Sequence, residues 1–537
     1  MKTLDKALEI GKTSATGSLH LFIGKIASTI ILAIGTIILQ GIILESDYGL
    51  YFLALIPATT FLIFQDWGVG TAIARHCAQF RAANKEADLR KIVIAGLTFE
   101  VTTGLFLTAL AALTANYLAS TIFGQPTSVI LIIIASTTIF STSIFVVTTN
   151  VFIGFERMKL LSLTLLCQAI AQGITAPLLV YFGYGALGAV IGYTLASVAA
   201  SLVSVILLYF AVMKNLSKVP NNKLDITETL KPLLKYGVPL AIGTILGGLL
   251  TQFYSFMTAL YVKDLILIGN YKVASNFLVL LGFFSVPITT VLFPAFSKLN
   301  PQKEPEIIKT VFASSVKYAS LLIVPATMAL IVLSNQIVGT LYGAKWSLAP
   351  PFMALSFATS LLTVFGSLSL GGLVLALGET RMMLKLNVIT LASGVPLAYL
   401  LIPSLGITGV ILGLLLAGVP SLFVGLYLIW RRYGTKIDYP ASARILLASV
   451  IATAVIYLFL SVLTAPYWIE LGVGLILFMF IYLICSPLIG AVNQTDLNSL
   501  RAMFSELGFF SKIIEIPLII MEKPLKIRRS HTAINDH

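Results

Sequence analysis

Charged side chains are scarce in this chain of 537 residues, of which only 11% are charged while 58% are hydrophobic. The mean hydropathy is +0.97. A water-soluble chain of this length would form several domains with far more surface charge. Instead, apolar runs of about 17 to 30 residues recur along the sequence, each long enough to cross a hydrocarbon core of about 30 Å. We therefore predict an all-α protein that crosses a membrane many times.

Cysteine and histidine are also rare, with three Cys and four His in the sequence. Cys77, Cys167 and Cys485 lie far apart, so they indicate no disulfide framework. The histidines show no metal-ligand spacing. We find neither a nucleotide-binding phosphate loop nor a catalytic triad signature. The sequence therefore predicts no metal, no cofactor and no catalytic residue, so any energy for transport would come from a gradient or a partner.

The apolar runs predict about fourteen membrane-spanning helices. They cover residues 18–40, 48–74, 92–120, 128–152, 160–182, 185–213, 236–261, 273–295, 318–339, 348–377, 386–402, 406–430, 445–463 and 471–489. The tail beyond residue 490 is basic, and its apolar residues between Phe504 and Ile516 predict an interfacial helix interrupted near Pro517. A loosely ordered basic tail is the alternative.

The distribution of Lys and Arg gives the orientation. With the N-terminus in the cytoplasm, 31 of the 35 basic residues fall in cytoplasmic segments and three in outer loops. Both termini are then cytoplasmic, and the first span is a permanent anchor. The net charge of +13 draws the cytoplasmic face toward anionic membrane lipids. No nucleic-acid partner is needed to explain it.

Two halves of the sequence repeat each other. The segment Gly154–Met158 resembles Gly378–Met382 at an offset of 224 residues, and the glycine pattern that begins at Gly185 recurs from Gly406 at an offset of 221. Six spans separate the copies, so they have the same orientation and form a parallel repeat. We predict two six-helix lobes (1–213 and 236–430), a cytoplasmic linker (214–235), two extra spans (431–490) and a tail (491–537).

Several short segments carry a resemblance to a known family. They are Leu44–Tyr51, Asp66–Gly68, Gly154–Arg157, Phe293–Ser297, Leu341–Trp346 and Leu375–Arg381. Their order from about Asp5 to Ile489 resembles the polysaccharide transporter, or O-antigen-type flippase, branch of the multidrug/oligosaccharidyl-lipid/polysaccharide exporter superfamily. The resemblance implies a MATE-like fold and the flipping of polyprenyl-phosphate-linked oligosaccharides across the cell membrane. Spans 1, 2 and 8 lack the dense arginines of lipid II flippases, which argues against lipid II as the substrate.

Three charged residues inside predicted spans are the candidate functional residues, because a charge at the bilayer centre costs at least about 2.5–3.5 kcal/mol. Lys25, Asp66 and Glu100 each lie roughly 11–12 Å from the cytoplasmic end of their spans. We predict that they share a wet cavity, in which Lys25 contacts a substrate phosphate and an acid binds a coupling H⁺ or Na⁺. Alternatively, Lys25 snorkels to the interface and Asp66 caps a break at Trp67–Gly70.

A polar stripe on the fifth span comprises Thr164, Gln168, Gln172 and Thr175 at helical spacing. Gln168 and Gln172 could contact a sugar, but hydrogen bonds between helices are the favoured interpretation of the stripe. Lys272, near the outer end of span 8, is predicted to be an exposed interfacial lysine.

Two other functions compete with a flippase. A cation-coupled multidrug or metabolite antiporter belongs to the same transport class. A membrane-embedded glycosyltransferase or polymerase ranks low, because the short outer loops contain only four acidic residues.

Overall fold

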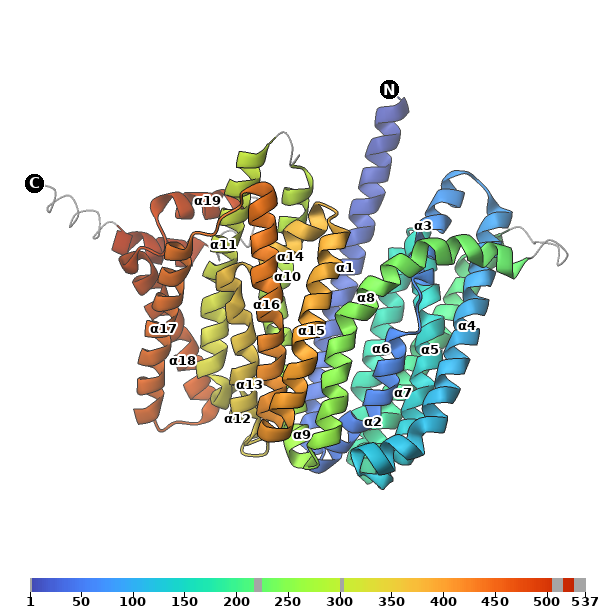
Figure 1. Cartoon of the computed structure of the whole chain (residues 1–537), viewed down its shortest axis with the longest axis horizontal. Coiled ribbons are helices and arrows are strands. Elements are labelled where there is room, and N and C mark those ends of the chain that lie inside the picture. Colours follow the sequence, from blue (N-terminus) through green and yellow to red (C-terminus); the bar gives the residue numbers. More distant parts are fainter. Residues whose placement is uncertain (1, 217–224, 300–303, 505–514, 526–537) are drawn as a thin grey trace, which may run out of the picture. The chain divides into compact units, whose positions relative to one another are not determined.

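The computed structural model describes residues 2–216, 225–299, 304–504 and 515–525, and nearly all of them are helical (Figure 1). The first part of the chain forms α1 (Lys2–Ile42), α2 (Glu45–Ile63), α3 (Val69–Ala82), α4 (Glu86–Tyr117), η1 (Leu118–Phe123), η2 (Pro126–Ser128), α5 (Val129–Gly154), α6 (Met158–Leu179), η3 (Val180–Tyr184), α7 (Gly185–Ala211), η4 (Met213–Asn215) and α8 (Ile226–Tyr261).

The second part forms α9 (Leu265–Asn276), α10 (Val279–Ser297), α11 (Pro305–Val332), α12 (Ser334–Tyr342), α13 (Ala349–Ala358), η6 (Thr359–Phe365), α14 (Ser367–Ala376), α15 (Thr380–Leu405), α16 (Ile407–Tyr433), α17 (Tyr439–Val462), α18 (Tyr467–Ile489) and α19 (Gln494–Phe504). A further helix covers residues 515–525.

The span count agrees with the sequence. Within the described residues, 12 stretches are long and apolar enough to cross a membrane, or 13 when one bent pair is counted as a span. One of the 12 stretches, Met158–Asn215, has 58 residues, which is far more than one crossing needs. It contains α6 and α7, two helices that pack against each other. Counting them separately, and counting the bent pair as one span, gives the fourteen crossings that the sequence predicts.

Four predicted spans are divided between helices, and one of them, residues 318–339, is divided between α11 and α12. Residues 48–74 are divided between α2 and α3, with Gly68 left-handed at the break (φ 77°). Residues 273–295 are divided between α9 and α10. Residues 348–377 bend by 61° where Gly366 separates η6 from α14. Broken helices of this kind are tolerated in membranes where protein or a cavity satisfies the freed backbone groups.

The chain divides into two compact units. The first contains Met1–Lys272 with Ala398–Val410, and the second contains Val273–Leu397 with Ile411–His537. A buried apolar core in the first unit joins α3, α4, α5 and α8, and a second core joins α11, α14 and α16. By packing, α8 belongs to the first unit. The boundaries drawn from the repeat, at 213 and 236, remain a prediction.

The repeat is visible in the backbone, where the matching helix ends pair Glu156 with Gly378 and not Gly154 with Gly378 as in the sequence alignment. Glu156 (φ 57°) and Gly378 (φ 68°) are left-handed. In each case the next residue donates its N–H to the carbonyl five residues earlier, from Arg157 to Phe152 and from Glu379 to Val374. Both hydrogen bonds belong to the same helix-ending motif. Gly185 (φ 49°), the first residue of α7, and Gly406 (φ 56°), just before α16, both have positive φ.

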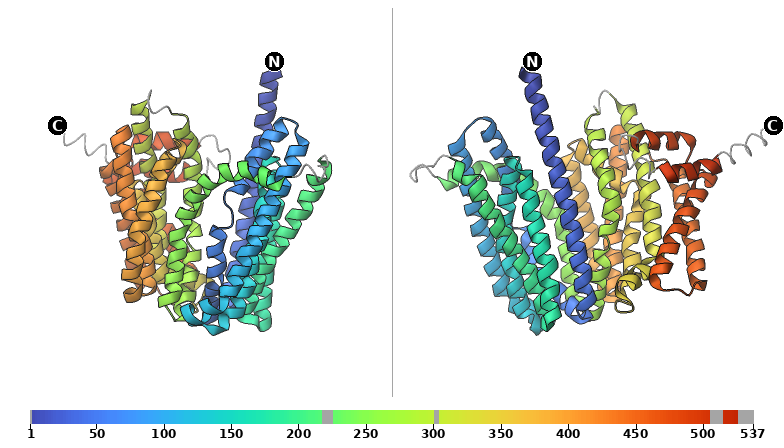
Figure 2. Two further views of the ribbon diagram at one scale, coloured as in Figure 1. Left: turned by 45° about the vertical axis from the view of Figure 1, so that its right-hand side comes forward. Right: turned by 180° about the vertical axis from the view of Figure 1, so that it is seen from behind.

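Small residues allow α1 to lie against α6 (Figure 2). A Cβ on Gly24 would come within 2.5 Å of the Ser162 side chain, and a Cβ on Gly35 would meet the Gly173 backbone. The contacting residue numbers increase together along the two helices, from Gly24 with Ser162 to Gly35 with Gly173, so α1 and α6 run parallel. Close contact through small residues is a common basis of helix association in membranes.

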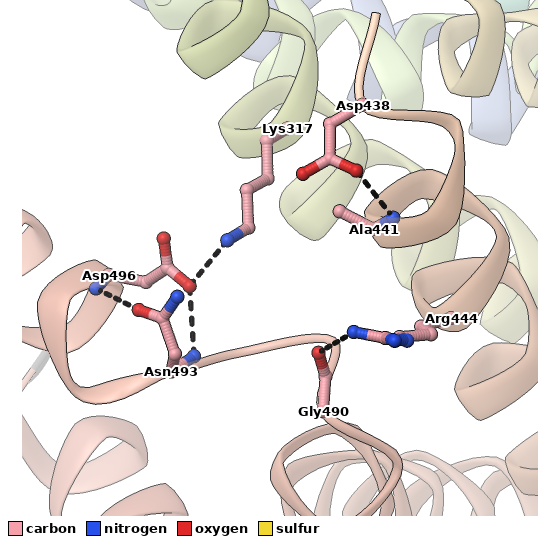
Figure 3. Close-up of polar contacts among 7 residues, drawn as sticks. All are labelled: Lys317, Asp438, Ala441, Arg444, Gly490, Asn493 and Asp496. Carbon is pink, nitrogen blue, oxygen red and sulfur yellow. Dashed lines mark hydrogen bonds and ion pairs between the residues drawn. The ribbon is translucent and has the colours of Figure 1, made fainter.

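The basic tail is anchored by polar contacts. Asp496 in the first turn of α19 accepts from Lys317 Nζ of α11 (2.6 Å) and from the Asn493 N–H, while its own N–H donates to Asn493 Oδ1 (Figure 3). Arg501 pairs with Glu522 at 2.7 Å. The predicted interfacial helix falls mostly on residues 505–514, outside the described residues. Helix 515–525 contains Pro517 in its first turn, where a missing N–H does no harm.

Candidate functional site

Glu100 is the most deeply buried of the predicted site residues. It lies on α4 with no exposed surface. Its Oε2 accepts a hydrogen bond from Gln65 Nε2 (3.2 Å), which follows α2. Its Oε1 is also buried but has no hydrogen-bond partner among the described residues. Such an oxygen is exceptional, because most buried polar atoms are paired.

Asp66 lies beside Gln65 at the break between α2 and α3. Its Oδ1 accepts the N–H of Gly70 at 3.1 Å, so the carboxylate caps the first turn of α3. It also acts electrostatically on Glu100. The structure therefore brings two of the three predicted residues together, and it gives Asp66 the capping geometry that the sequence offered as an alternative. We refer to Gln65, Asp66 and Glu100 as the carboxylate site.

The structure shows no contact between Lys25 and the carboxylate site among the described residues. It is exposed on α1, among the exposed apolar residues Phe22, Ile23 and Ile26. The described part of the chain shows no ion pair between Lys25 and a carboxylate. Its ammonium is therefore available to a ligand or to lipid headgroups.

The polar stripe on α6 separates into two kinds of residue. Thr164 donates to the Leu161 carbonyl, and Thr175 donates to Ala171 and, across to α7, to Gly192. Gln168 and Gln172 are half-buried, and we find no hydrogen bond from either amide within the described chain. Only Thr175 thus makes the predicted bond between helices, and the two glutamine amides remain free for a ligand.

Polar contacts also tie α2 to α9. Asn270 Nδ2 donates to Glu45 Oε2 (2.8 Å), and Gly49 and Gly269 let the two backbones approach closely. Lys272 is half-buried rather than exposed, and its Nζ lies 5.3 Å from the centre of the Phe52 ring. The expectation of an exposed lysine therefore needs correction, because the aromatic ring covers the ammonium group.

Gln65 was not predicted to be a site residue, yet it provides the only hydrogen bond to the Glu100 carboxylate among the described residues. A signal existed, since Gln65 is a long polar side chain next to Asp66 within an apolar run. Its role could not be derived, because Glu100 is 35 residues away and on another helix.

Comparisons with solved structures show what the fold resembles. The fold resembles the lipid II flippase MurJ in an inward closed conformation, with a TM-score of 0.67 and 17% identity over 88% of this chain and 98% of that one. It also resembles a multidrug resistance MATE family transporter of the MOP superfamily in an inward-facing conformation, with a TM-score of 0.61 and 18% identity over 76% of this chain and 94% of that one. The expected MATE-like fold is confirmed, and with 12 candidate spans among its described residues the chain is a multi-pass membrane protein.

Sequence matches then give the family. The family model described as polysaccharide biosynthesis protein matches residues 38–351, and the model for the lipid II flippase MurJ matches residues 271–481. Because the first match covers more than half of the chain, the chain belongs to the polysaccharide biosynthesis protein family.

One curated relative also matches the chain, over a smaller part of its length. A probable low-salt glycan biosynthesis flippase of Haloferax volcanii is 22% identical over 269 residues, which are 50% of this chain and 55% of the relative. The match thus spans about half the length of this curated relative.

Proposed function

We propose that the chain is a transporter that flips a polyprenyl-phosphate-linked oligosaccharide across the cell membrane by alternating access. The observation that carries this proposal is the match of residues 38–351 to the polysaccharide biosynthesis family. The related flippase of Haloferax volcanii supports it. Both termini lie in the cytoplasm, as the distribution of Lys and Arg indicates, so the substrate enters from the basic side.

The carboxylate site couples flipping to a proton. An ionised carboxylate buried without a cation is strongly disfavoured, and no Lys or Arg pairs with Glu100 in the described chain. A proton on the unpaired Oε1 removes that charge. A second charge at Asp66 repels an ionised Glu100 further. Na⁺ is the alternative coupling ion at the same carboxylates.

The other predicted residues contact the substrate. Lys25 binds the phosphate of the lipid carrier, because its ammonium is exposed and has no carboxylate partner among the described residues. Gln168 and Gln172 offer amide groups to a sugar. These roles are proposed because the three side chains make no ion pair or side-chain hydrogen bond within the described residues.

The test is flipping of a fluorescent lipid-linked oligosaccharide in proteoliposomes, with and without an imposed proton gradient. We expect wild-type flipping to respond to the gradient, and Glu100→Gln, which resembles the protonated form, to flip at a rate that the gradient no longer changes. Glu470→Gln is the matched control, because Glu470 is also a buried glutamate that accepts a hydrogen bond from a glutamine, but it lies outside the carboxylate site.

Three outcomes would contradict parts of the proposal. Gradient-driven flipping that persists in Glu100→Gln would show that Glu100 does not bind the coupling proton. Lipid II as the only substrate flipped would overturn the substrate class. Efflux of small organic cations without any flipping would assign the chain to multidrug transport.

A further inference from the structure

The second unit contains a pocket that the transport proposal does not use. It has a volume of about 400 Å³ and lies where α16 ends and α17 begins, against α11. Phe312 of α11, Tyr427 and Trp430 of α16, and Tyr439 of α17 form apolar walls, and Thr435 and Lys436 of the connecting segment complete it. We call this the aromatic pocket. Its volume is within the range of small-molecule binding sites.

One polar group in the aromatic pocket has no partner. Thr435 is 3% exposed, and its hydroxyl makes no hydrogen bond within the described residues. A buried hydroxyl without a partner is unfavourable. A ligand oxygen in the pocket could accept its proton.

The charges at the rim favour an anion. Lys436 and the neighbouring Arg431 are exposed, and neither forms an ion pair in the described part of the chain. Other cations nearby are already paired, Arg432 with Glu379 at 2.7 Å and Lys309 with Glu306 at 2.6 Å. The nearby Asp438 is engaged as the cap of α17, where it accepts the Ala441 N–H.

The aromatic pocket lies at the membrane boundary, where lipid headgroups are found. Two membrane spans end at it, because α16 ends at Tyr433 and α17 begins at Tyr439. The Tyr427, Trp430 and Tyr439 side chains are 50–52% exposed, and such aromatic residues belong at the boundary between lipid and water. The surrounding basic loops are predicted to face the cytoplasm, where the leaflet is anionic.

We propose that the aromatic pocket binds one anionic phospholipid of the bilayer. Its phosphate contacts Lys436 and accepts the Thr435 hydroxyl, and one acyl chain lies along Tyr427 and Trp430. A lipid-linked oligosaccharide fits less well, because a pocket of about 400 Å³ with a single polar wall has no place for several sugars. The bound lipid holds α11, α16 and α17 together, so it stabilises this part of the second unit. The proposal goes beyond flipping and does not depend on it.

The test measures thermal unfolding of the purified full-length chain in detergent while lipid is added. Dioleoyl phosphatidylglycerol and dioleoyl phosphatidylcholine have the same acyl chains and differ in headgroup charge. We expect phosphatidylglycerol to raise the transition temperature at a lower concentration. Lys436→Gln should need about tenfold more phosphatidylglycerol for half of the shift, because a charge-assisted hydrogen bond is lost. Lys385→Gln, which removes an exposed lysine outside the pocket, should behave as wild type.

Thr435→Val gives a second and independent readout. It removes the unpaired hydroxyl at nearly constant shape, so we expect a higher transition temperature without lipid and a smaller shift with phosphatidylglycerol. Equal responses to the two lipids, or Lys436→Gln and Thr435→Val that both match Lys385→Gln, would overturn the proposal. A shift produced by a polyprenyl phosphate but not by phosphatidylglycerol would do the same, because the pocket would then belong to the transported lipid.

Discussion

The ion pair between Lys317 and Asp496 should hold α19 against the second unit, and Asp496→Asn tests this directly. The two side chains are only 16% and 8% exposed, and Nζ and Oδ2 are 2.6 Å apart. Asn at position 496 can still accept the Asn493 N–H, so the substitution removes the charge and keeps the reciprocal cap. What remains is a largely buried ammonium without its counterion.

The expected magnitude lies between two limits. Exposed ion pairs contribute about 0–1 kcal/mol, whereas removal of one partner of a fully buried pair costs about 3–5 kcal/mol. For a pair exposed to this small extent we expect about 2 kcal/mol. If α19 opens locally, the population of the open form rises about 30-fold.

Limited trypsin digestion measures this opening at the bond after Arg501, which lies within α19. Asp496→Asn should be cut there about 30-fold faster than wild type when opening is in rapid equilibrium. Asp438→Asn is the matched control, because Asp438 also caps a helix but has no ion pair among the described residues (Figure 3). It should leave the rate of cleavage unchanged.

A double-mutant cycle with Lys317→Met separates the pair from other effects. The double variant should be less sensitive to trypsin than the sum of the single changes predicts, with a coupling of about 1–2 kcal/mol. Equal cleavage rates for wild type and Asp496→Asn would refute the reasoning. A coupling of zero would show that the contact does not hold α19 in solution.

Three further predictions use purified protein or proteoliposomes. Gly68→Ala should destabilise the protein by more than about 1–2 kcal/mol in thermal unfolding, because φ at Gly68 is positive and a Cβ would meet the Gly237 backbone. Gly243→Ala is the control and should be neutral or stabilising, because a Cβ at Gly243 would lie in open space. Gln168→Ala should slow flipping without lowering stability, whereas Thr175→Val should cost about 1 kcal/mol of stability. Glu470→Gln should leave the response of flipping to a proton gradient unchanged.

The span count could be predicted from sequence because it depends on a property averaged over about 20 residues. The breaks within spans could not be predicted in the same way. Gly366 bends one apolar run by 61°, yet glycine is common in membrane helices and most glycines do not break them. Only the packing of the neighbouring helices determines which glycine adopts a positive φ. The break at Gly68 was easier to predict, because Asp66 is a polar residue placed to cap the next helix.

Part of the candidate site could also be predicted from sequence, because a general energetic cost identifies two of its residues. The high cost of burying a charge identifies Glu100 and Asp66 from sequence alone. Lys25 has the same predicted depth as the two acids, but depth along a helix does not say which way a side chain points. Lys25 is exposed, whereas the adjacent Gly24 is buried against α6. Rotation about the helix axis is determined by such contacts between helices, which the sequence did not reveal.

Two buried Gln–Glu pairs have the same residue types but differ in their other contacts. Gln336 Nε2 donates to Glu470 Oε2 at 3.2 Å, the same bond and distance as between Gln65 and Glu100. Both glutamates are buried. The second oxygen of Glu470, however, accepts the Ala465 N–H at 3.3 Å, whereas that of Glu100 has no partner in the described chain. Glu470 therefore has both carboxylate oxygens hydrogen-bonded and joins α12 to α18. Glu100 lacks that second bond, so it is the glutamate expected to bind and release a proton during transport.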